Sequence, residues 1–213
     1  MSSIKSGMSD TDSGARDAVP CIGAKSRVRD RIFETACELF YRHGIHGVGV
    51  DEIAAEAGSN KMSFYRSFAS KDALVTAYLR QQEREFWVRW DTAVAQFPDR
   101  PRSQIEALFE AHQNVVKDKT CRGCALGNAA VEISEDEDDL SKLVRSYKEE
   151  VRRRLRGMSR ALGARDADNL GDALMLLMDG GYFTRLVFAG NSGPISAMLP
   201  AVRALIDAHL AAT

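Results

Sequence analysis

The chain has 213 residues, of which 45% are hydrophobic and 28% are charged, and its formal net charge is −1. A chain of this length and composition can bury a core without disulfides or metals, as ordinary globular proteins do. The longest unbroken apolar run, residues 173–178, is far too short to span a bilayer, and the N-terminus lacks the apolar segment of a secretory signal. We therefore expect a cytoplasmic protein with no membrane partner. Because the net charge is close to zero, any nucleic-acid interface must be local.

Helical periodicity runs through most of the chain, and the alternation typical of strands is nearly absent. Residues 1–24 are the exception: they are rich in Ser, Gly and Asp without an apolar pattern, and we expect a disordered arm there. The sequence therefore predicts an all-α fold with no strand, in which a small helical domain (25–70) and a larger one (71–213) follow the arm. The nine helices are expected at about 25–43, 51–57, 61–68, 71–94, 103–117, 124–133, 134–162, 167–188 and 195–211.

Residues 51–68 (DEIAAEAGSNKMSFYRSF) predict two short helices joined by a link that contains Gly58, which is the arrangement of a helix-turn-helix. Phe64 and Phe68 lie one turn apart and are expected to anchor the second helix to the core. The opposite face then presents groups that can donate to phosphates or base edges, and a methionine that can meet a thymine methyl. A helical hairpin with no nucleic-acid role is the alternative. The expected DNA-binding residues are Asn60, Lys61, Met62, Ser63, Tyr65, Arg66 and Lys71.

The pieces ETACELFYRHG, VDEIAAEAG, FYRSF and SKDAL follow one another within residues 31–79. In this order and spacing they resemble the N-terminal domain of the TetR family of transcriptional regulators. The piece RGCALGNAAVE is similar to a segment near the sixth helix of many members. The resemblance implies that residues 25–70 bind double-stranded DNA. It also implies that residues 71–213 form a ligand-binding and dimerisation domain for a small-molecule effector.

Position by position, the resemblance implies that Lys61, Ser63, Tyr65 and Lys71 touch DNA, with Tyr65 and Lys71 at phosphates. Two departures stand out. Val48 and Gly49 occupy positions where members often have Thr or Ser, whose hydroxyl would cap the second helix and bond a phosphate. Met62 replaces a common glycine, which implies a changed base preference.

Aromatic, methionine and a few polar side chains lie on the helices that resemble the pocket-forming helices of the family. They serve equally well in a core, so the core stays an alternative for each. Phe86 belongs to the same group. The ligand-binding residues that we expect are Trp87, Trp90, Phe109, His112, Asn128, Tyr147, Met175, Met178 and Tyr182.

The last two predicted helices carry wide apolar stripes, and glycines 180 and 181 would allow a close helix approach. The family uses this pair for a two-fold four-helix interface, and the composition fits one. The alternative is that these helices only close the core of a monomer. The expected dimer-interface residues are Leu174, Leu177, Gly181, Arg185, Met198, Leu199, Val202, Leu205 and Ile206.

Cys121 and Cys124 form a CxxC just before a predicted helix, where the helix N-terminus could lower a thiol pKa. No second pair at zinc-binding spacing accompanies them, so we expect a structural or incidental role and neither a metal nor a cofactor. Oxidation of these thiols as a signal stays open.

The sequence thus favours a homodimeric, TetR-like repressor that a small molecule releases from a pseudo-palindromic operator. The alternative is a helical small-molecule or redox sensor without a DNA-binding role. We expect no enzyme, since neither a nucleophile elbow, nor a P-loop, nor an HExxH spacing occurs.

Overall fold

The computed structural model describes residues 28–133, 139–188 and 193–210, and within these ranges it contains nine α-helices and no strand. The all-α prediction is therefore confirmed. The arm predicted for residues 1–24 and the first turn predicted for the helix at 134–162 lie outside the described residues. The helices are α1 (Val28–His43), α2 (Val50–Glu56), α3 (Lys61–Ser67), α4 (Lys71–Ala95), α5 (Pro101–Lys117), α6 (Ala125–Glu132), α7 (Asp139–Ala161), α8 (Ala167–Val187) and α9 (Met198–Leu210).

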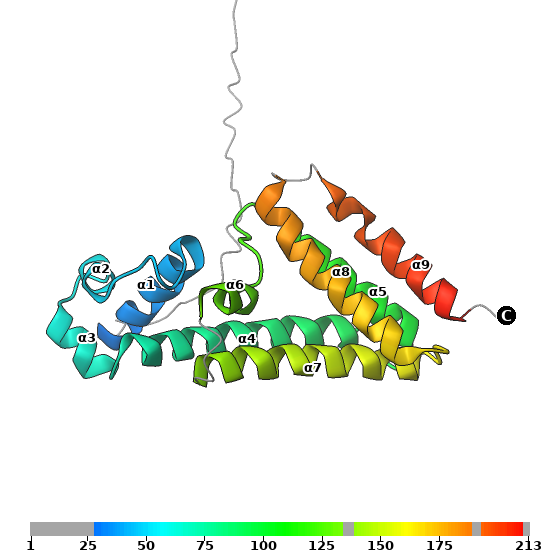
Figure 1. Cartoon of the computed structure of the whole chain (residues 1–213), viewed down its shortest axis with the longest axis horizontal. Coiled ribbons are helices and arrows are strands. Elements are labelled where there is room, and N and C mark those ends of the chain that lie inside the picture. The colour runs from blue at the N-terminus through cyan, green and yellow to red at the C-terminus, as the bar shows by residue number, and fades with distance from the viewer. Residues whose placement is uncertain (1–27, 134–138, 189–192, 211–213) are drawn as a thin grey trace, which may run out of the picture.

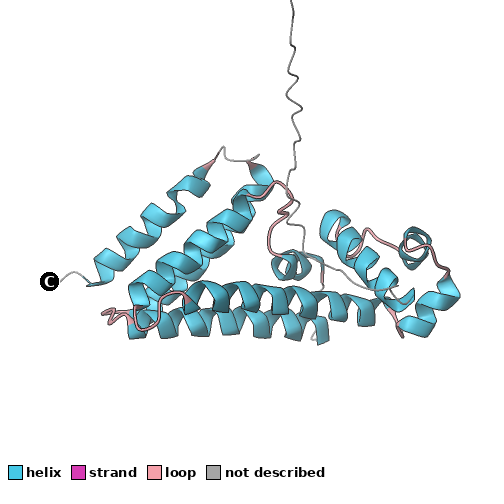
Figure 2. Cartoon of the chain, turned by 180° about the vertical axis from the view of Figure 1, so that it is seen from behind, coloured by secondary structure: helices cyan, strands magenta, loops and turns pink. Residues whose placement is uncertain are grey.

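The first three helices form a cluster at one end of the molecule, and the long helix α4 leads away from it (Figure 1). Helix α7 runs beside α4, while α5 and α8 pack against this pair and α9 lies outermost against α5 and α8. The short helix α6 sits between the cluster and the larger helical body, in contact with α4 and α7. The view from behind shows the same order of layers (Figure 2). The division at residue 70 stays a prediction.

One continuous apolar core joins the two ends of the molecule, from Ile32 in α1 to Ile206 in α9. In α1 the buried side chains Ile32, Ala36 and Phe40 recur every fourth residue, as one face of an amphipathic helix requires. Most of the stability of such helices comes from packing of this face rather than from intrinsic propensity. The core therefore sets the position of every element that carries a candidate site.

Side-chain caps fix where several helices begin. The Asn60 Oδ1 accepts a hydrogen bond from the Ser63 N–H at 2.9 Å, and the Ser70 Oγ accepts one from the Ala73 N–H at 3.0 Å. These caps satisfy amide groups that have no partner within the helix. Between α2 and α3, Gly58 has a φ of +58°, a left-handed conformation that glycine adopts without strain. Gly58 therefore allows the chain to turn sharply between these two helices.

Within the described residues, two predicted boundaries differ from the structure by more than one residue. Helix α5 begins at Pro101 rather than near residue 103, because proline has no N–H to lose in the first helical turn. The helix predicted from residue 195 begins instead with a 3₁₀ turn at Pro194–Ala197 and becomes α-helical at Met198. Both changes are confined to helix ends. None of the helices that the structure describes combines the length and hydropathy that a membrane crossing requires.

Candidate nucleic-acid interface and ligand pocket

Helix α3 is held from one side and open on the other. Phe64 is completely buried, and its ring lies 6.1 Å from that of Phe68, which is also buried. The opposite face carries Met62 and Tyr65, whose exposed fractions are 74% and 50%. Met62 and Tyr65 are three residues apart on the helix, so their exposed side chains are neighbours on this face. The geometry therefore gives α3 a face suited to contact with another molecule.

The polar residues of this face are already ordered. The Lys61 Nζ donates to the Asp51 Oδ2 of α2 at 3.0 Å, and this hydrogen bond raises the pKa of Lys61. The Arg66 guanidinium donates to the Ser63 Oγ at 3.2 Å. Both pairs are exposed, so they cost little to exchange for phosphate or base contacts.

The predicted DNA-binding residues form one group in sequence and space. Asn60 is the N-cap of α3, and Lys61, Met62, Ser63, Tyr65 and Arg66 all belong to this helix. Lys71 begins α4 immediately after the Ser70 cap. Backbone amides and a lysine at a helix start can hold a phosphate. The arrangement can therefore offer side chains to a groove and a helix N-terminus to the backbone of a nucleic acid.

The two departures at positions 48 and 49 have different structural meanings. Val48 is completely buried, so a polar side chain there would lose apolar packing. Gly49 is the N-cap of α2, and its N–H donates to the Glu52 carboxylate at 3.4 Å. Because glycine has no side chain, the hydroxyl half of a capping box is missing at this helix start.

A hollow of about 320 Å³, part of it open to solvent, lies between α4, α5 and α8. Four of the listed ligand-binding residues, together with Phe86 from the same predicted group, line it. Arg89, Leu108, Ala111 and Val115 were not predicted; the last three recur at helical spacing in α5, one turn before, beside and after His112. The lining residues are Phe86, Arg89, Trp90, Leu108, Ala111, His112, Val115, Met178 and Tyr182.

His112 is the polar centre of this hollow. Its Nε2 lies 2.9 Å from the carbonyl oxygen of Met178, and since a carbonyl only accepts, the Nε2 carries the proton. Its ring stands edge-on to Tyr182, with the ring centroids 4.5 Å apart. Burial lowers the pKa of His112 to about 4, so the imidazole is neutral at neutral pH.

The other predicted ligand-binding residues lie outside this hollow. Phe109 is completely buried, and Tyr147 is buried with its ring 5.2 Å from that of Phe86. Trp87 is covered by the Arg154 guanidinium at 4.0 Å. The Asn128 Nδ2 donates to the carbonyl of Arg122 at 2.8 Å. Met175 is partly buried and packs against the core.

The predicted dimer residues face mostly inward. Leu174, Gly181, Met198, Val202 and Ile206 are buried within the protomer, and Leu177, Leu199 and Leu205 are partly buried against its core. Arg185 donates to the carbonyls of Asp118 and Lys119 at the end of α5. The physical reason is the packing of α8 and α9 on α5, which uses these side chains. The exposed apolar residues and glycine of α8 are Leu176, Gly180, Phe183, Leu186 and Val187.

The two cysteines of the CxxC take part in local structure. Cys121 is buried, and the Cys124 Sγ accepts a hydrogen bond from the Gly127 N–H at 3.3 Å, which caps α6. Between them, the carbonyl of Gly123 accepts a hydrogen bond from the Tyr41 hydroxyl at 3.3 Å. Within the described ranges, no group of three or more His, Cys, Asp and Glu residues is placed to hold a metal.

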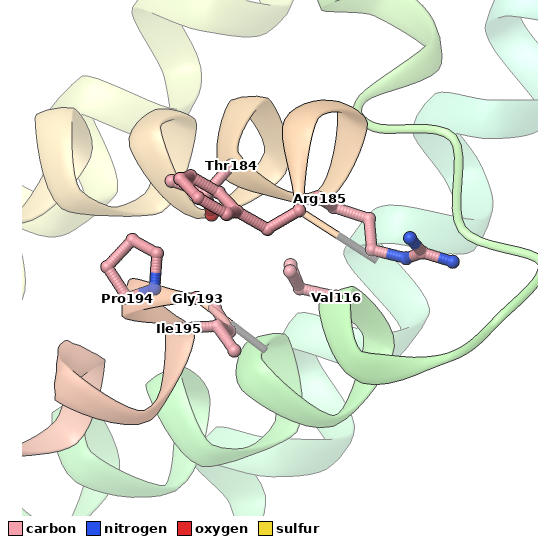
Figure 3. Close-up of a pocket in the computed structure, with 7 residues that line it drawn as sticks. Val116, Thr184, Arg185, Gly193, Pro194 and Ile195 are labelled. Carbon is pink, nitrogen blue, oxygen red and sulfur yellow. The ribbon is translucent and has the colours of Figure 1, made fainter. Parts of the chain in front are cut away.

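A second, smaller hollow of about 190 Å³ lies where α8 ends and α9 begins (Figure 3). Val116, Thr184 and Arg185 border it on one side, and Gly193, Pro194 and Ile195 on the other. Phe188, the C-cap of α8, also lines it.

Comparison with known proteins finds a family described as bacterial regulatory proteins of the tetR family, whose model matches residues 32–78. The HTH-type transcriptional repressor SCO4008 of Streptomyces coelicolor is 35% identical over 82 residues, or 38% of this chain and 41% of that protein. The HTH-type transcriptional repressor ComR of Escherichia coli is 24% identical over 139 residues, or 62% of this chain and 66% of that protein. The matches thus span less than two thirds of these relatives.

Solved structures match over more of the chain. SCO4454 of Streptomyces coelicolor, described as a TetR-family transcriptional regulator, has a TM-score of 0.80 and 27% identity, with 85% of this chain and 95% of that chain covered. A putative regulator of Streptomyces avermitilis has a TM-score of 0.74 and 28% identity, with 86% and 98% covered. The similarity therefore extends beyond the first three helices to the larger helical body.

Proposed function

The chain belongs to the TetR family of DNA-binding bacterial regulatory proteins, and from this premise we propose that it is a homodimeric repressor whose operator affinity is set by a small-molecule effector. The observation that carries the proposal is the open face of α3, where Met62 and Tyr65 project from a helix that Phe64 fixes to the core. A helical sensor without a DNA-binding role is not favoured, because the matched region is the helix-turn-helix itself.

On DNA, α3 would act as the recognition helix in a major groove. Lys61, Ser63 and Arg66 supply donors for base edges or phosphates, and Met62 supplies an apolar contact for a thymine methyl. Tyr65 and Lys71 would hold phosphates on either side. Two such units would read half-sites about 34–36 Å apart on a pseudo-palindrome, which requires a dimer.

We assign the interface of that dimer to the exposed stripe of α8. Leu176, Gly180, Phe183 and Val187 follow one another at steps of three and four and so share one face. A Cβ at Gly180 would meet no atom of the described residues within 4 Å, so a second helix could approach closely there. A contiguous apolar helix face is self-complementary under two-fold symmetry.

Effector binding in the hollow beside His112 would shift the dimer toward a spacing of the two α3 helices that does not fit the operator. This is coupling through differential binding to two states, and about 1–3 kcal/mol would relieve repression 5–150-fold.

The direct test is a titration of the protein against DNA from immediately upstream of its own gene, by fluorescence anisotropy at several salt concentrations. Tyr65→Phe and Lys71→Ala are expected to weaken binding to all sequences. Lys71→Ala should also lower the log–log salt slope by about 0.9, as one lost phosphate contact does. Met62→Gly should change the preference among sequences.

Lys119→Ala removes an exposed lysine from the loop after α5 and is the matched control for Lys71→Ala. If Lys119→Ala and Lys71→Ala reduce affinity equally, or if none of the α3 changes affects DNA binding, the assignment of the interface is wrong.

A further inference from the structure

The larger of the two hollows carries charge of one sign only. Among the residues that the structure describes, Arg89 is the single cation in its lining, and no acidic residue lines it. Phe86, Trp90 and Met178 contribute apolar and aromatic walls. An apolar recess with a few placed polar groups is the usual form of a small-molecule site.

Arg89 is without an ion pair or hydrogen bond in the part of the chain that the structure describes. Neighbouring arginines on α7 are neutralised: Arg152 and Arg156 both donate to Asp172, at 2.7 Å and 2.6 Å. Arg154 is shared between carboxylates of α4 and α7. The positive charge at the hollow is therefore available to a ligand.

The remaining polar groups of the hollow are neutral. Burial lowers the pKa of His112 and raises that of Tyr182, so neither is ionised at neutral pH. The nearby carboxylate of Asp179 is held by the Lys148 Nζ at 2.5 Å. Within the described part of the chain, no other group in the lining offsets the charge of Arg89.

The position of Arg89 gives the site a direction. Arg89 is exposed to solvent, whereas the adjacent Trp90 is buried, as is Phe86 one turn before it. A ligand that fills the hollow would thus leave its polar end at the mouth and place its body between α4, α5 and α8. A guanidinium at such a mouth matches a carboxylate, with which it can form two parallel hydrogen bonds.

We propose that the effector is an amphipathic anion, a carboxylate on an aromatic or aliphatic body, with the carboxylate on Arg89 and the body against Phe86, Trp90 and Met178. The inference rests on the proposed function, since it names the class of ligand that occupies the effector pocket. A cation would be repelled by Arg89, and a neutral analogue would forgo the charge-assisted hydrogen bonds.

Three compounds of one shape test the class: 4-phenylbutyrate, 4-phenylbutan-1-ol and 4-phenylbutylamine, titrated by calorimetry into the full chain. The chain has two tryptophans, so Trp87→Phe leaves Trp90 as the only one, and its fluorescence reports occupancy of the hollow directly. The carboxylate is expected to bind about tenfold or more tightly than the alcohol, and the amine least. Added salt should weaken the binding of the carboxylate but not that of the alcohol.

Two variants and a control locate the charge. Arg89→Gln is expected to lower the affinity for the carboxylate about tenfold and to leave the affinity for the alcohol unchanged. Arg89→Lys should restore most of the affinity for the carboxylate. Arg84→Gln removes an exposed arginine from the same helix outside the hollow, where it donates to Gln81, and should change neither. The proposal is overturned if the alcohol or the amine binds as tightly as the carboxylate, or if the carboxylate fails to bind. It is also overturned if Arg89→Gln lowers the affinities for the carboxylate and the alcohol by the same factor.

DNA binding is measured separately on the same protein without any of the three compounds. Specific DNA binding together with no preference for the carboxylate would overturn the ligand class and leave the regulator standing. Preference for the carboxylate together with no specific DNA binding would overturn the proposed DNA-binding function and leave the ligand class standing.

Discussion

The Glu132 Oε2, at the end of α6, accepts a hydrogen bond from the backbone N–H of His46 at 2.8 Å. His46 lies in the link between α1 and α2, so this contact joins the larger helical body to the cluster that carries α3. The carboxylate also lies against Gly44, where a Cβ would come within 3.0 Å of it. Close by, the Tyr41 hydroxyl of α1 accepts from the Arg122 N–H at 2.8 Å. These contacts make α6 a route by which a ligand could move α3.

Glu132→Ala is expected to weaken that coupling. The ratio of operator affinities measured without and with 4-phenylbutyrate should move toward one by about threefold or more, because a shared two-state element is loosened. Anisotropy titrations at fixed salt give both affinities. Glu132→Gln keeps an acceptor oxygen and should resemble the unchanged protein. Equal coupling in the Ala and Gln variants would contradict this role for the hydrogen bond.

The close approach of α7 and α8 at Gly171 predicts a stability effect. A Cβ there would lie 2.7 Å from the backbone N and Cα of Arg156, and a backbone cannot give way as a side-chain tip can. Gly171→Ala should lower the free energy of unfolding by about 2 kcal/mol or more. At Gly157 on α7 a Cβ would meet none of the described atoms within 4 Å, so Gly157→Ala should raise the free energy of unfolding by about 0.5–1 kcal/mol. Urea unfolding measures both, and a destabilised Gly157→Ala would undermine the comparison.

The buried His112 predicts a pH dependence of stability. Its folded pKa is about 4, lowered by burial, against an ordinary value of 6.5, so the unfolded chain binds the proton first. Stability should therefore be fully present above about pH 6.5 and fall as the pH drops toward 4, by about 1.4 kcal/mol per pH unit. The charged groups that face the ring are Asp179, which opposes the shift, and Lys148 and Arg89, which add to it.

His112→Gln should remove this dependence while it keeps an N–H for the Met178 carbonyl. Urea unfolding at pH 7 and pH 5 gives the difference. The pKa of Glu150 is held at about 2 by Arg153 and Arg154, so this carboxylate affects stability at a lower pH and does not contribute appreciably to the difference between pH 7 and pH 5. If both proteins lost the same stability between the two pH values, His112 would not be the group responsible.

The exposed stripe of α8 predicts the oligomeric state. Phe183→Glu places a charge in the proposed two-fold interface and should convert the dimer into a monomer with much weaker operator binding. Val88→Glu is the matched control, since Val88 lies on α4 with an exposed fraction of 65% against 66% for Phe183. Light scattering after size exclusion separates the outcomes. A Phe183→Glu variant that stays dimeric would place the interface elsewhere.

The position of α3, the proposed recognition helix, could be predicted from the sequence because Phe64 and Phe68 define a single buried face on a short helix with turn residues on both sides. The orientation of α8 could not be predicted in the same way. Residues 173–178 are apolar on every side, so periodicity does not tell which face meets the core. The structure turns Gly181 inward against His112 and Gly180 outward. Arg89 was missed for a related reason: an arginine on a long helix resembles a solvated charge until its neighbours in α5 and α8 are known.

Substitution of Gly49 is expected to raise both the stability of the protein and its DNA affinity. Its φ of −91° and ψ of 157° suit residues with a side chain, and in the part of the chain that the structure describes a Cβ there would meet no atom within 4 Å. Gly49→Ser would complete a capping box with Glu52 and add a hydroxyl near the expected phosphate path. We expect a few tenths of a kcal/mol in stability and a severalfold gain in DNA affinity at fixed salt. Gly49→Ala, with the same backbone restriction but no hydroxyl, is the control. If Ser and Ala change the DNA affinity equally, position 49 acts through the backbone and makes no phosphate contact.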